Sequence, residues 1–181
     1  MLLRGKQASG LLTQQKMLRA AVKLFLKKRY EGTTTAETAR AAGMPPSSFF
    51  RAFPSKEALL LELDKRMFSG QFALAGQHSA AQAPVLLYAV ETAIQLTLAE
   101  LNENLRQIYV EAYTLPENLE IIHRMTAEML HRIFGAYMPG YSVSDFYESD
   151  IGSAAIMRGY MARPCDVYFT LERKLERFLQ L

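Results

Sequence analysis

Apolar residues recur every three or four positions along most of the chain, which is the spacing of a helix with one buried face. The first such stretch begins at Thr13 and ends near Gly32, with apolar residues at Met17, Ala20, Ala21, Leu24 and Phe25. Further stretches run from Ser55 to beyond Gly70, from Pro84 to Leu101, from Asn102 to Leu115, from Pro116 to Met138, from Ser144 to Arg163 and from Cys165 to Leu181. The sequence has no turn signals between alternating apolar residues, which would indicate β-hairpins. The pattern therefore predicts an all-α protein.

Two short helices are predicted between the first two long stretches. Thr34 followed by Glu37 has the spacing of a capping box, so a helix begins there. Gly43 suits the left-handed residue that ends a helix, and Pro46 suits the first position of the next helix, which runs through Ala52. This arrangement is typical of a helix-turn-helix, whose second helix lies in the major groove of DNA. An ordinary helical hairpin with solvated Ser and Arg side chains is the alternative that this pattern leaves open.

Three sequence blocks in and around the short helices carry a family resemblance. They are Tyr30 to Thr34, Ala39 to Gly43 and Phe53 to Leu59, within a match from about Gln15 to Leu63. These blocks resemble the N-terminal domain of the tetracycline-repressor-like (TetR) family of transcriptional regulators. The resemblance implies an N-terminal three-helix helix-turn-helix DNA-binding domain and a C-terminal helical bundle for ligand binding and dimerisation.

The resemblance also implies a set of DNA contacts on the two short helices and at the start of the next one. These residues are Thr34, Thr35, Pro45, Pro46, Ser47, Ser48, Phe50, Arg51 and Lys56. Lys56 is expected at a phosphate, and Ser47, Ser48 and Arg51 at base edges. Phe50 stands where the family usually has a tyrosine whose hydroxyl contacts phosphate. That hydrogen bond is therefore absent here.

Charge is distributed unevenly along the chain. Up to Arg66 there are thirteen Lys or Arg residues against five Asp or Glu, whereas the remainder has eight against thirteen. A basic N-terminal part on an acidic C-terminal part indicates that the former meets a polyphosphate such as DNA. A solvated charged surface, RNA or an anionic membrane would also be compatible with this distribution.

The predicted domain order follows from these elements. It comprises a flexible arm of residues 1–12, a helix-turn-helix domain of residues 13–54, a linking helix and connection of residues 55–83, and a ligand-binding and dimerisation domain of residues 84–181. The Ala-, Gly- and Gln-rich stretch 73–83 marks the boundary by composition. We expect a cytoplasmic protein that does not cross a membrane, because no signal peptide or spanning segment is apparent and the single cysteine, Cys165, fits a reducing compartment.

The C-terminal stretches supply candidates for two further surfaces. A mostly apolar ligand pocket with a few polar groups is expected from Tyr88, Gln95, Tyr109, Tyr113, His123, Met129, Phe134, Met157 and Tyr160. The resemblance implies a four-helix dimer interface, for which the candidates are Ala155, Gly159, Ala162, Leu171, Leu175 and Phe178. Both sets are also compatible with residues that close the core of a single subunit.

Two Glu-x-x-His spacings, Glu120 to His123 and Glu128 to His131, suggest a metal-dependent helical-bundle enzyme as an alternative. Both lie in one predicted helix, where eight residues span about 12 Å. Paired metals instead need ligands that converge from several helices. We therefore expect no metal, no cofactor and no enzymatic activity.

The resulting hypothesis is a ligand-responsive DNA-binding regulator, a homodimeric repressor that leaves a pseudo-palindromic operator when a largely apolar small molecule binds. A helical protein-interaction module without DNA binding is the remaining alternative.

Overall fold

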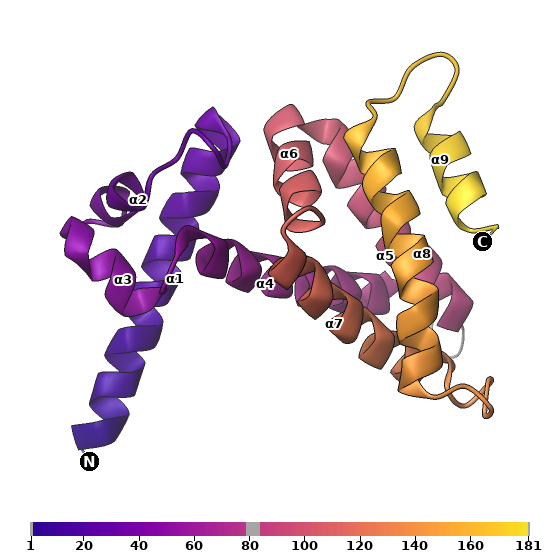
Figure 1. Ribbon diagram of the computed structural model, residues 1–181, viewed down its shortest axis with the longest axis horizontal. Coiled ribbons are helices and arrows are strands. Elements are labelled where there is room, and N and C mark those ends of the chain that lie inside the picture. Colours follow the sequence, from indigo (N-terminus) through magenta and orange to yellow (C-terminus); the bar gives the residue numbers. More distant parts are fainter. Residues whose placement is uncertain (1, 79–83, 181) are drawn as a thin grey trace. The chain divides into compact units, whose positions relative to one another are not determined.

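The computed structural model describes residues 2–78 and 84–180, with side chains described for residues 10–77 and 84–180 (Figure 1). All regular structure in these ranges is helical, which confirms the all-α prediction. The chain divides into two compact units, Met1–Asp64 and Lys65–Leu181, which we call the head and the body. Helix α4, Lys56–His78, contains the point of division. The predicted connection 73–83 is therefore helical as far as His78, and residues 79–83 lie outside the described residues.

The head consists of α1 (Leu2–Lys28), α2 (Thr35–Ala41), the 3-10 turn η1 (Pro46–Ser48), α3 (Phe49–Ala52) and the first turns of α4. Residues 2–12, for which the sequence predicts a flexible arm, are helical instead. No proline interrupts the chain there, so the backbone hydrogen bonds of α1 can continue towards the N-terminus. The two predicted short helices are present, although the second one starts as a 3-10 turn.

Local signals set the helix ends of the head as predicted. The Thr34 hydroxyl accepts from the Glu37 amide at 3.2 Å, and the Glu37 carboxylate accepts from the Thr34 amide at 2.9 Å, which completes the capping box. Gly43 has φ = 74°, a left-handed conformation that glycine adopts without steric cost. Ser55 caps α4 by accepting from the amide of Ala58 at 3.1 Å.

An apolar core fixes the short helices of the head in place. Its fully buried members include Met17, Ala21, Phe25, Ala39, Phe49, Leu59 and Leu60. Phe49 and Phe53 lie four residues apart, and their ring centroids are 6.0 Å apart. The exposed side of η1 and α3 is therefore held in one orientation by the aromatic side chains behind it.

The body contains the rest of α4 and helices α5 (Pro84–Leu101), α6 (Glu103–Ala112), α7 (Pro116–Phe134), α8 (Val143–Ala162) and α9 (Leu171–Phe178). Helix α7 packs along α8, and α5 packs against α6, α8 and α9. α5 begins and ends as predicted. The prediction for α7 is wrong at its end, since the helix stops at Phe134 rather than at Met138.

The last helix begins later than predicted, at Leu171 rather than at Cys165. The Asp166 carboxylate accepts hydrogen bonds from the amides of Tyr168 and Phe169 at 2.8 and 2.9 Å, which closes a turn. Asp is favoured in such turns because its side chain satisfies nearby backbone amides. Thr170 then caps α9.

A buried lysine anchors the chain that precedes α9. Lys174 is 0% exposed and donates to the Glu100 carboxylate at 2.6 Å, to the Tyr160 carbonyl at 2.7 Å and to the Arg163 carbonyl. Glu100 also accepts from Arg106 at 3.0 Å. The buried ammonium is thus paired with a carboxylate and surrounded by acceptors, which is what a charge in a protein interior requires.

The six dimer candidates fall into two groups. Phe178 is buried in the core of the body together with Leu96, Tyr109 and Met161, and Leu171 and Leu175 pack against this core. These three candidates pack in or against the body's own core, and their part in a dimer interface stays a prediction. The other three lie on an exposed side of α8, namely Ala155, Gly159 and Ala162.

Helix α5 is the one described helix that is long and apolar enough to cross a membrane when judged by length and composition alone, with a mean hydropathy of 1.2. The expectation that no segment of this kind exists is therefore wrong by that criterion. In the structure, however, α5 carries buried Glu91, Thr92 and Gln95, and it packs between other helices of the body. Helix α5 therefore contributes buried polar side chains to the interior of the body.

Candidate nucleic-acid interface and ligand cavity

The second short helix of the head has one buried side and one exposed side. Ser48 and Phe49 are buried, whereas the exposed residues are Pro45, Pro46, Ser47, Phe50 and Arg51. Phe50 is 62% exposed although it is large and apolar. An aromatic ring and a guanidinium side by side on such a helix supply the apolar and hydrogen-bonding contacts that base edges accept.

The structure corrects the position of Ser48. The sequence places this residue on the exposed side with Ser47 and Arg51, but it is only 4% exposed. Its hydroxyl accepts a hydrogen bond from the Arg51 guanidinium at 2.7 Å. Ser48 therefore orients Arg51 rather than reaching outwards itself.

Lys56 makes intramolecular contacts in the head. Its ammonium donates to the carbonyls of Tyr30 and Thr33 at 3.2 and 3.3 Å, and it lies 4.1 Å from the centroid of the Tyr30 ring. It thus ties α4 to the turn before α2. Its contact with phosphate stays a prediction, as do those of exposed Thr34 and half-buried Thr35.

The N-terminus of α2 carries a stable negative charge. Hydrogen bonds from Lys28 and then from Thr34 lower the pKa of Glu37 to about 2. The Lys28 ammonium lies 2.6 Å from the carboxylate. A negative charge at a helix N-terminus stabilises the helix. The Glu37 carboxylate, paired with Lys28, therefore stabilises the start of α2, the helix that precedes the second short helix.

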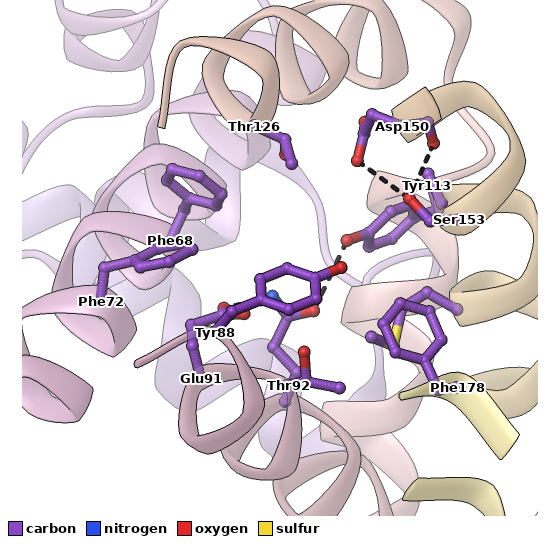
Figure 2. A pocket seen from close by; sticks show the side chains of 13 residues that line it. Phe68, Phe72, Tyr88, Glu91, Thr92, Tyr113, Thr126, Asp150, Ser153 and Phe178 are labelled. Atoms are coloured by element: carbon purple, nitrogen blue, oxygen red, sulfur yellow. Dashed lines mark hydrogen bonds between the residues drawn. The ribbon is translucent and has the colours of Figure 1, made fainter. Parts of the chain in front are cut away.

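The body contains a cavity that is partly open to solvent (Figure 2). Its lining residues are Phe68, Phe72, Tyr88, Glu91, Thr92, Gln95, Tyr113, Thr126, Asp150, Ser153, Ala154, Met157 and Phe178. Water-sized molecules fit into ≈ 30 Å³ between these side chains. Figure 2 shows Phe68 and Phe72 on one side of the cavity and Asp150 with Ser153 on the opposite side. The cavity is thus lined by aromatic side chains on one side and by an acidic side chain on the other.

Two buried carboxyl groups dominate the electrostatics of the cavity. Burial raises the pKa of Glu91 to about 7; a hydrogen bond from the Gln95 amide opposes this rise, and the charge of Asp150 adds to it. Burial also raises the pKa of Asp150, which a hydrogen bond from His123 opposes. The His123 Nδ1 atom lies 2.7 Å from the Asp150 Oδ2 atom. Neutral pH is therefore where Glu91 changes charge.

The hydroxyl groups around these carboxyls are deeply buried. Burial raises the pKa of both Tyr88 and Tyr113, and the charges of Glu91 and Asp150 add to the rise, so both phenols stay protonated. Thr92 is 1% exposed, and its hydroxyl has no hydrogen-bond partner. The Thr92 hydroxyl lies near the Tyr88 phenol and partly offsets the increase in the pKa of Tyr88. The two groups do not, however, meet the criteria of a hydrogen bond. A buried polar group without a partner costs free energy unless something else satisfies it.

A second, open cleft adjoins the cavity. It is lined by Tyr113, Thr114, Leu119, His123, Ile151, Ala154, Ala155 and Arg158, and water-sized molecules fit into ≈ 390 Å³ of it. The Arg158 guanidinium donates to the Thr114 hydroxyl at 3.1 Å on this side. Tyr113 and Ala154 line both the cavity and the cleft. The phenol of Tyr113 is therefore part of the wall between the two spaces.

The structure brings together only some of the nine predicted pocket residues. Tyr88, Gln95, Tyr113 and Met157 line the cavity, and His123 lines the outer cleft. Tyr109 lies in the core, where its hydroxyl accepts from Gln71. Phe134 contacts the Tyr88 ring from a neighbouring cluster, whereas Met129 and Tyr160 line neither space.

Sequence reasoning missed the most distinctive cavity residues, namely Glu91, Thr92 and Asp150. One signal was available: Glu91 and Gln95 lie four residues apart in an otherwise apolar stretch, so they share one side of α5. Asp150 follows no comparable pattern.

The residues of the two Glu-x-x-His spacings do not converge. His123 is buried and pairs with Asp150, while Glu120 accepts from Arg124 and Tyr147. Glu128 and His131 are exposed. Among residues 2–78 and 84–180, no group of three potential ligands is placed to hold a metal ion.

Comparison with known proteins adds a sequence match in the head. Residues 17–63 match the family described as bacterial regulatory proteins, tetR family. A stretch of 49 residues is 43% identical to the HTH-type transcriptional regulator TcmR of Streptomyces glaucescens. That stretch covers 27% of this chain and 22% of the length of TcmR, so the match speaks for the DNA-binding domain alone.

Solved structures of similar fold cover almost the whole chain. Thermus thermophilus FadR, a TetR-family transcriptional repressor in complex with lauroyl-CoA, has a TM-score of 0.71 at 17% identity, with 93% of this chain and 92% of that chain covered. The fatty acid degradation regulator FadR of Bacillus halodurans has a TM-score of 0.58 at 14% identity, with 93% of each chain covered. At these identities the likeness establishes the fold. Residues 17–63 of the head therefore match the DNA-binding domain of the tetR family of bacterial regulatory proteins, and the chain as a whole has the fold of these solved structures.

Proposed function

We propose that this protein is a ligand-responsive, DNA-binding transcriptional repressor that acts as a homodimer on a pseudo-palindromic operator. The observation that carries the proposal is the exposed side of the second short helix, where Ser47, Phe50 and Arg51 project from a rigid apolar core. The basic excess of the head supports the same partner.

Two of these exposed residues, Arg51 and Phe50, have contacts that suit the major groove. Arg51 can donate two parallel hydrogen bonds to a guanine, and Phe50 can pack against a thymine methyl group. Ser48 supports the first contact because its hydroxyl already holds the guanidinium. Surrounding Lys and Arg side chains add phosphate contacts that are independent of sequence.

A dimer would place two heads on one duplex. The exposed small residues of α8, Ala155, Gly159 and Ala162, allow close approach of a second copy of the same helix. Two heads related by a two-fold axis would read half-sites that are related in the same way. The pseudo-palindromic operator follows from this symmetry.

Ligand control would act through α4. This helix runs from Lys56, which contacts the turn before α2, to Phe68 and Phe72 in the wall of the cavity. A ligand that needs Phe68 and Phe72 to move would favour one position of α4 over another. Useful control requires about 1–3 kcal/mol of difference in binding free energy between the DNA-binding and released conformers. The complex of T. thermophilus FadR with lauroyl-CoA supports a small-molecule site in a body of this fold.

The test is selection of genomic duplexes by the full-length protein, followed by binding measurements at fixed salt concentration. Arg51→Ala should weaken binding to the selected duplex by about 1–3 kcal/mol and relax the base preference at one position. Arg132→Ala, which removes an exposed arginine of the body, is the matched control and should leave the affinity unchanged. Retention of no duplex, or equal affinities of the Arg51 variant and wild type, would contradict the proposal.

A further inference from the structure

Two carboxylates of α5, the half-buried Glu100 and the buried Glu91, differ in their partners. Glu100 is paired with Lys174 and Arg106. Glu91 is only 3% exposed, yet no lysine or arginine of the described chain forms an ion pair with it, and the Gln95 amide is its hydrogen-bond donor. A carboxylate in a protein interior is costly unless a cation compensates it. The body therefore supplies a positive partner at Glu100 but leaves that position open at Glu91.

A second polar group in the cavity, the Thr92 hydroxyl, lacks a hydrogen-bond partner. The Thr92 hydroxyl is buried and makes no hydrogen bond, and Thr92 lines the same space as Glu91. Its position next to Glu91 on α5 brings an acceptor oxygen and a carboxylate to one wall. A ligand with N–H or C–H groups of positive character would meet both of them.

The remaining walls are rich in aromatic rings. Phe72, Tyr88, Tyr113 and Phe178 surround the free space, and Phe68 lies beside Phe72 with 4.9 Å between the ring centroids. The faces of aromatic rings attract cations, more strongly when water is excluded. An anionic head group would meet Glu91 and Asp150 and would be repelled.

We propose that this cavity binds a small organic cation, an amine or ammonium group on a short apolar or aromatic body, with the Glu91 carboxylate as its counter-ion. This assignment rests on the proposed function, because it names the chemical class of the effector. It also sets this chain apart from a regulator whose ligand is an anionic acyl-CoA. The free ≈ 30 Å³ suits the charged group, and room for the attached body requires that Phe68 moves outwards.

Binding of a cation should be linked to protons. Glu91 faces Asp150 of α8, Tyr88 of α5 and Tyr113, which follows the last residue of α6. His123 of α7 acts on Glu91 through Asp150. The residues that α4 and α9 contribute to the cavity, Phe68, Phe72 and Phe178, are uncharged. Because burial raises the pKa of Glu91 to about 7, a cation that requires the carboxylate will bind more tightly as the pH rises through neutrality.

The experiment uses calorimetric titration of the full-length protein with three probes of similar shape: benzylammonium, neutral benzyl alcohol and anionic benzoate. Wild type should bind benzylammonium about tenfold more tightly than benzyl alcohol, with benzoate weakest. Glu91→Gln should abolish this preference without changing the affinity for benzyl alcohol. Glu148→Gln, which removes an exposed carboxylate from α8, is the control and should keep the preference.

The pH series of wild type provides a readout that needs no variant. Between about pH 6 and pH 8 the affinity for benzylammonium should rise while that for benzyl alcohol stays constant, and the rise should vanish in Glu91→Gln. Benzoate binding as tightly as benzylammonium, a preference that is independent of pH or survives Glu91→Gln, or absence of binding by all three probes would overturn the proposal. Failure of genomic duplex selection alongside the expected cation binding would overturn the proposed function alone. Duplex binding without cation preference would overturn this ligand class alone.

Discussion

The head and the body bury different kinds of polar group. In the head the buried polar residues of the described chain are Thr33, Thr38 and Ser48. Their hydroxyls are satisfied nearby: Thr33 and Thr38 donate to backbone carbonyls at 2.9 and 3.0 Å, and Ser48 accepts from Arg51. The body instead buries ionisable side chains, namely Glu91, Arg106, His123, Asp150 and Lys174.

This difference separates a rigid unit from one that responds to its surroundings. The hydroxyls of the head keep their hydrogen bonds at any ordinary pH, so its arrangement is fixed by packing and capping. The buried carboxyls of the body change their charge and partners, and perturbed groups in a cavity are typical of binding sites. The head therefore holds one exposed surface in a fixed arrangement, whereas the charge state and conformation of the body can change when a ligand binds in its cavity.

The largest difference in stability between the head and the body is expected when Lys174 is replaced. Lys174→Met leaves Glu100 without its ammonium partner and removes the donor from the carbonyls of Tyr160 and Arg163, so the body should lose about 3–5 kcal/mol of stability. Hydrogen exchange resolved by peptide would show faster exchange in α5 and α9 and unchanged exchange in α2. Arg173→Met, at an exposed neighbouring position, is the control and should change neither. Equal stability of the two variants would mean that the buried ion pair does not hold α9.

Glu91 should give the next largest effect, and one that depends on pH. Because burial raises the folded-state pKa of Glu91 to about 7 from its ordinary value of 4.5, the carboxyl keeps its proton to higher pH in the folded state than in the unfolded state. The contribution of Glu91 to stability is therefore fully present below about pH 4.5 and is lost as the pH rises to about 7. Glu91→Gln, which stays neutral, should match wild type at low pH and exceed it by an amount on the order of 3 kcal/mol at pH 8.

Chemical denaturation of both proteins across this pH range would measure the difference. A stability difference that does not change with pH would show that Glu91 has the same pKa in the folded and the unfolded protein, and is therefore not perturbed by burial. Head peptides provide an internal control, because their hydrogen exchange should be the same in both proteins at each pH.

A smaller loss is expected from the capping box of the head. Thr34→Ala removes the side-chain acceptor for the Glu37 amide and should destabilise α2 by about 1 kcal/mol, with no effect on the body. Thr34→Ser keeps the hydroxyl and should restore the stability. Exchange protection of α2 that is unaffected by the alanine substitution would mean that packing alone defines this helix.

The smallest effect on folding is expected at Ser48. Ser48→Ala removes one hydrogen bond to Arg51, which is worth about 0.5–1.5 kcal/mol, and leaves the guanidinium free to adopt other rotamers. Affinity for the selected duplex should fall, but by less than in Arg51→Ala. If the double variant binds as well as Arg51→Ala alone, Ser48 acts through Arg51; a further loss would indicate a separate contact.

The head could be predicted from the sequence because its determinants are local. Thr34 and Glu37 cap a helix over three residues, Gly43 ends it, and Phe49 and Phe53 mark the buried side of the next helix. Ser48 escaped prediction because the second short helix begins as a 3-10 turn. With three residues per turn instead of 3.6, that turn changes which side chains point inwards.

The cavity could be predicted only in part because its members come from distant parts of the chain. Tyr88 and Tyr113 are recognisable as aromatic residues on helices, but their meeting with Asp150 depends on how α5, α6 and α8 pack. The same holds for Lys174, whose position in the sequence is that of an ordinary charged residue on a terminal helix. Contacts between residues of different helices leave no regular spacing in the sequence, so they cannot be predicted from it.

Site-specific photocrosslinking tests the central claim most directly, which is that the exposed side of η1 and α3 meets the duplex. Phe50 and Tyr137 are aromatic and similarly exposed, at 62% and 66%, but they lie on the head and on the body respectively. Each is replaced in turn by p-benzoylphenylalanine, and the protein is irradiated with the selected duplex. Crosslinks to DNA are expected from position 50 and none from position 137. Crosslinks from position 137 alone, or from neither position while the duplex is bound, would contradict this claim.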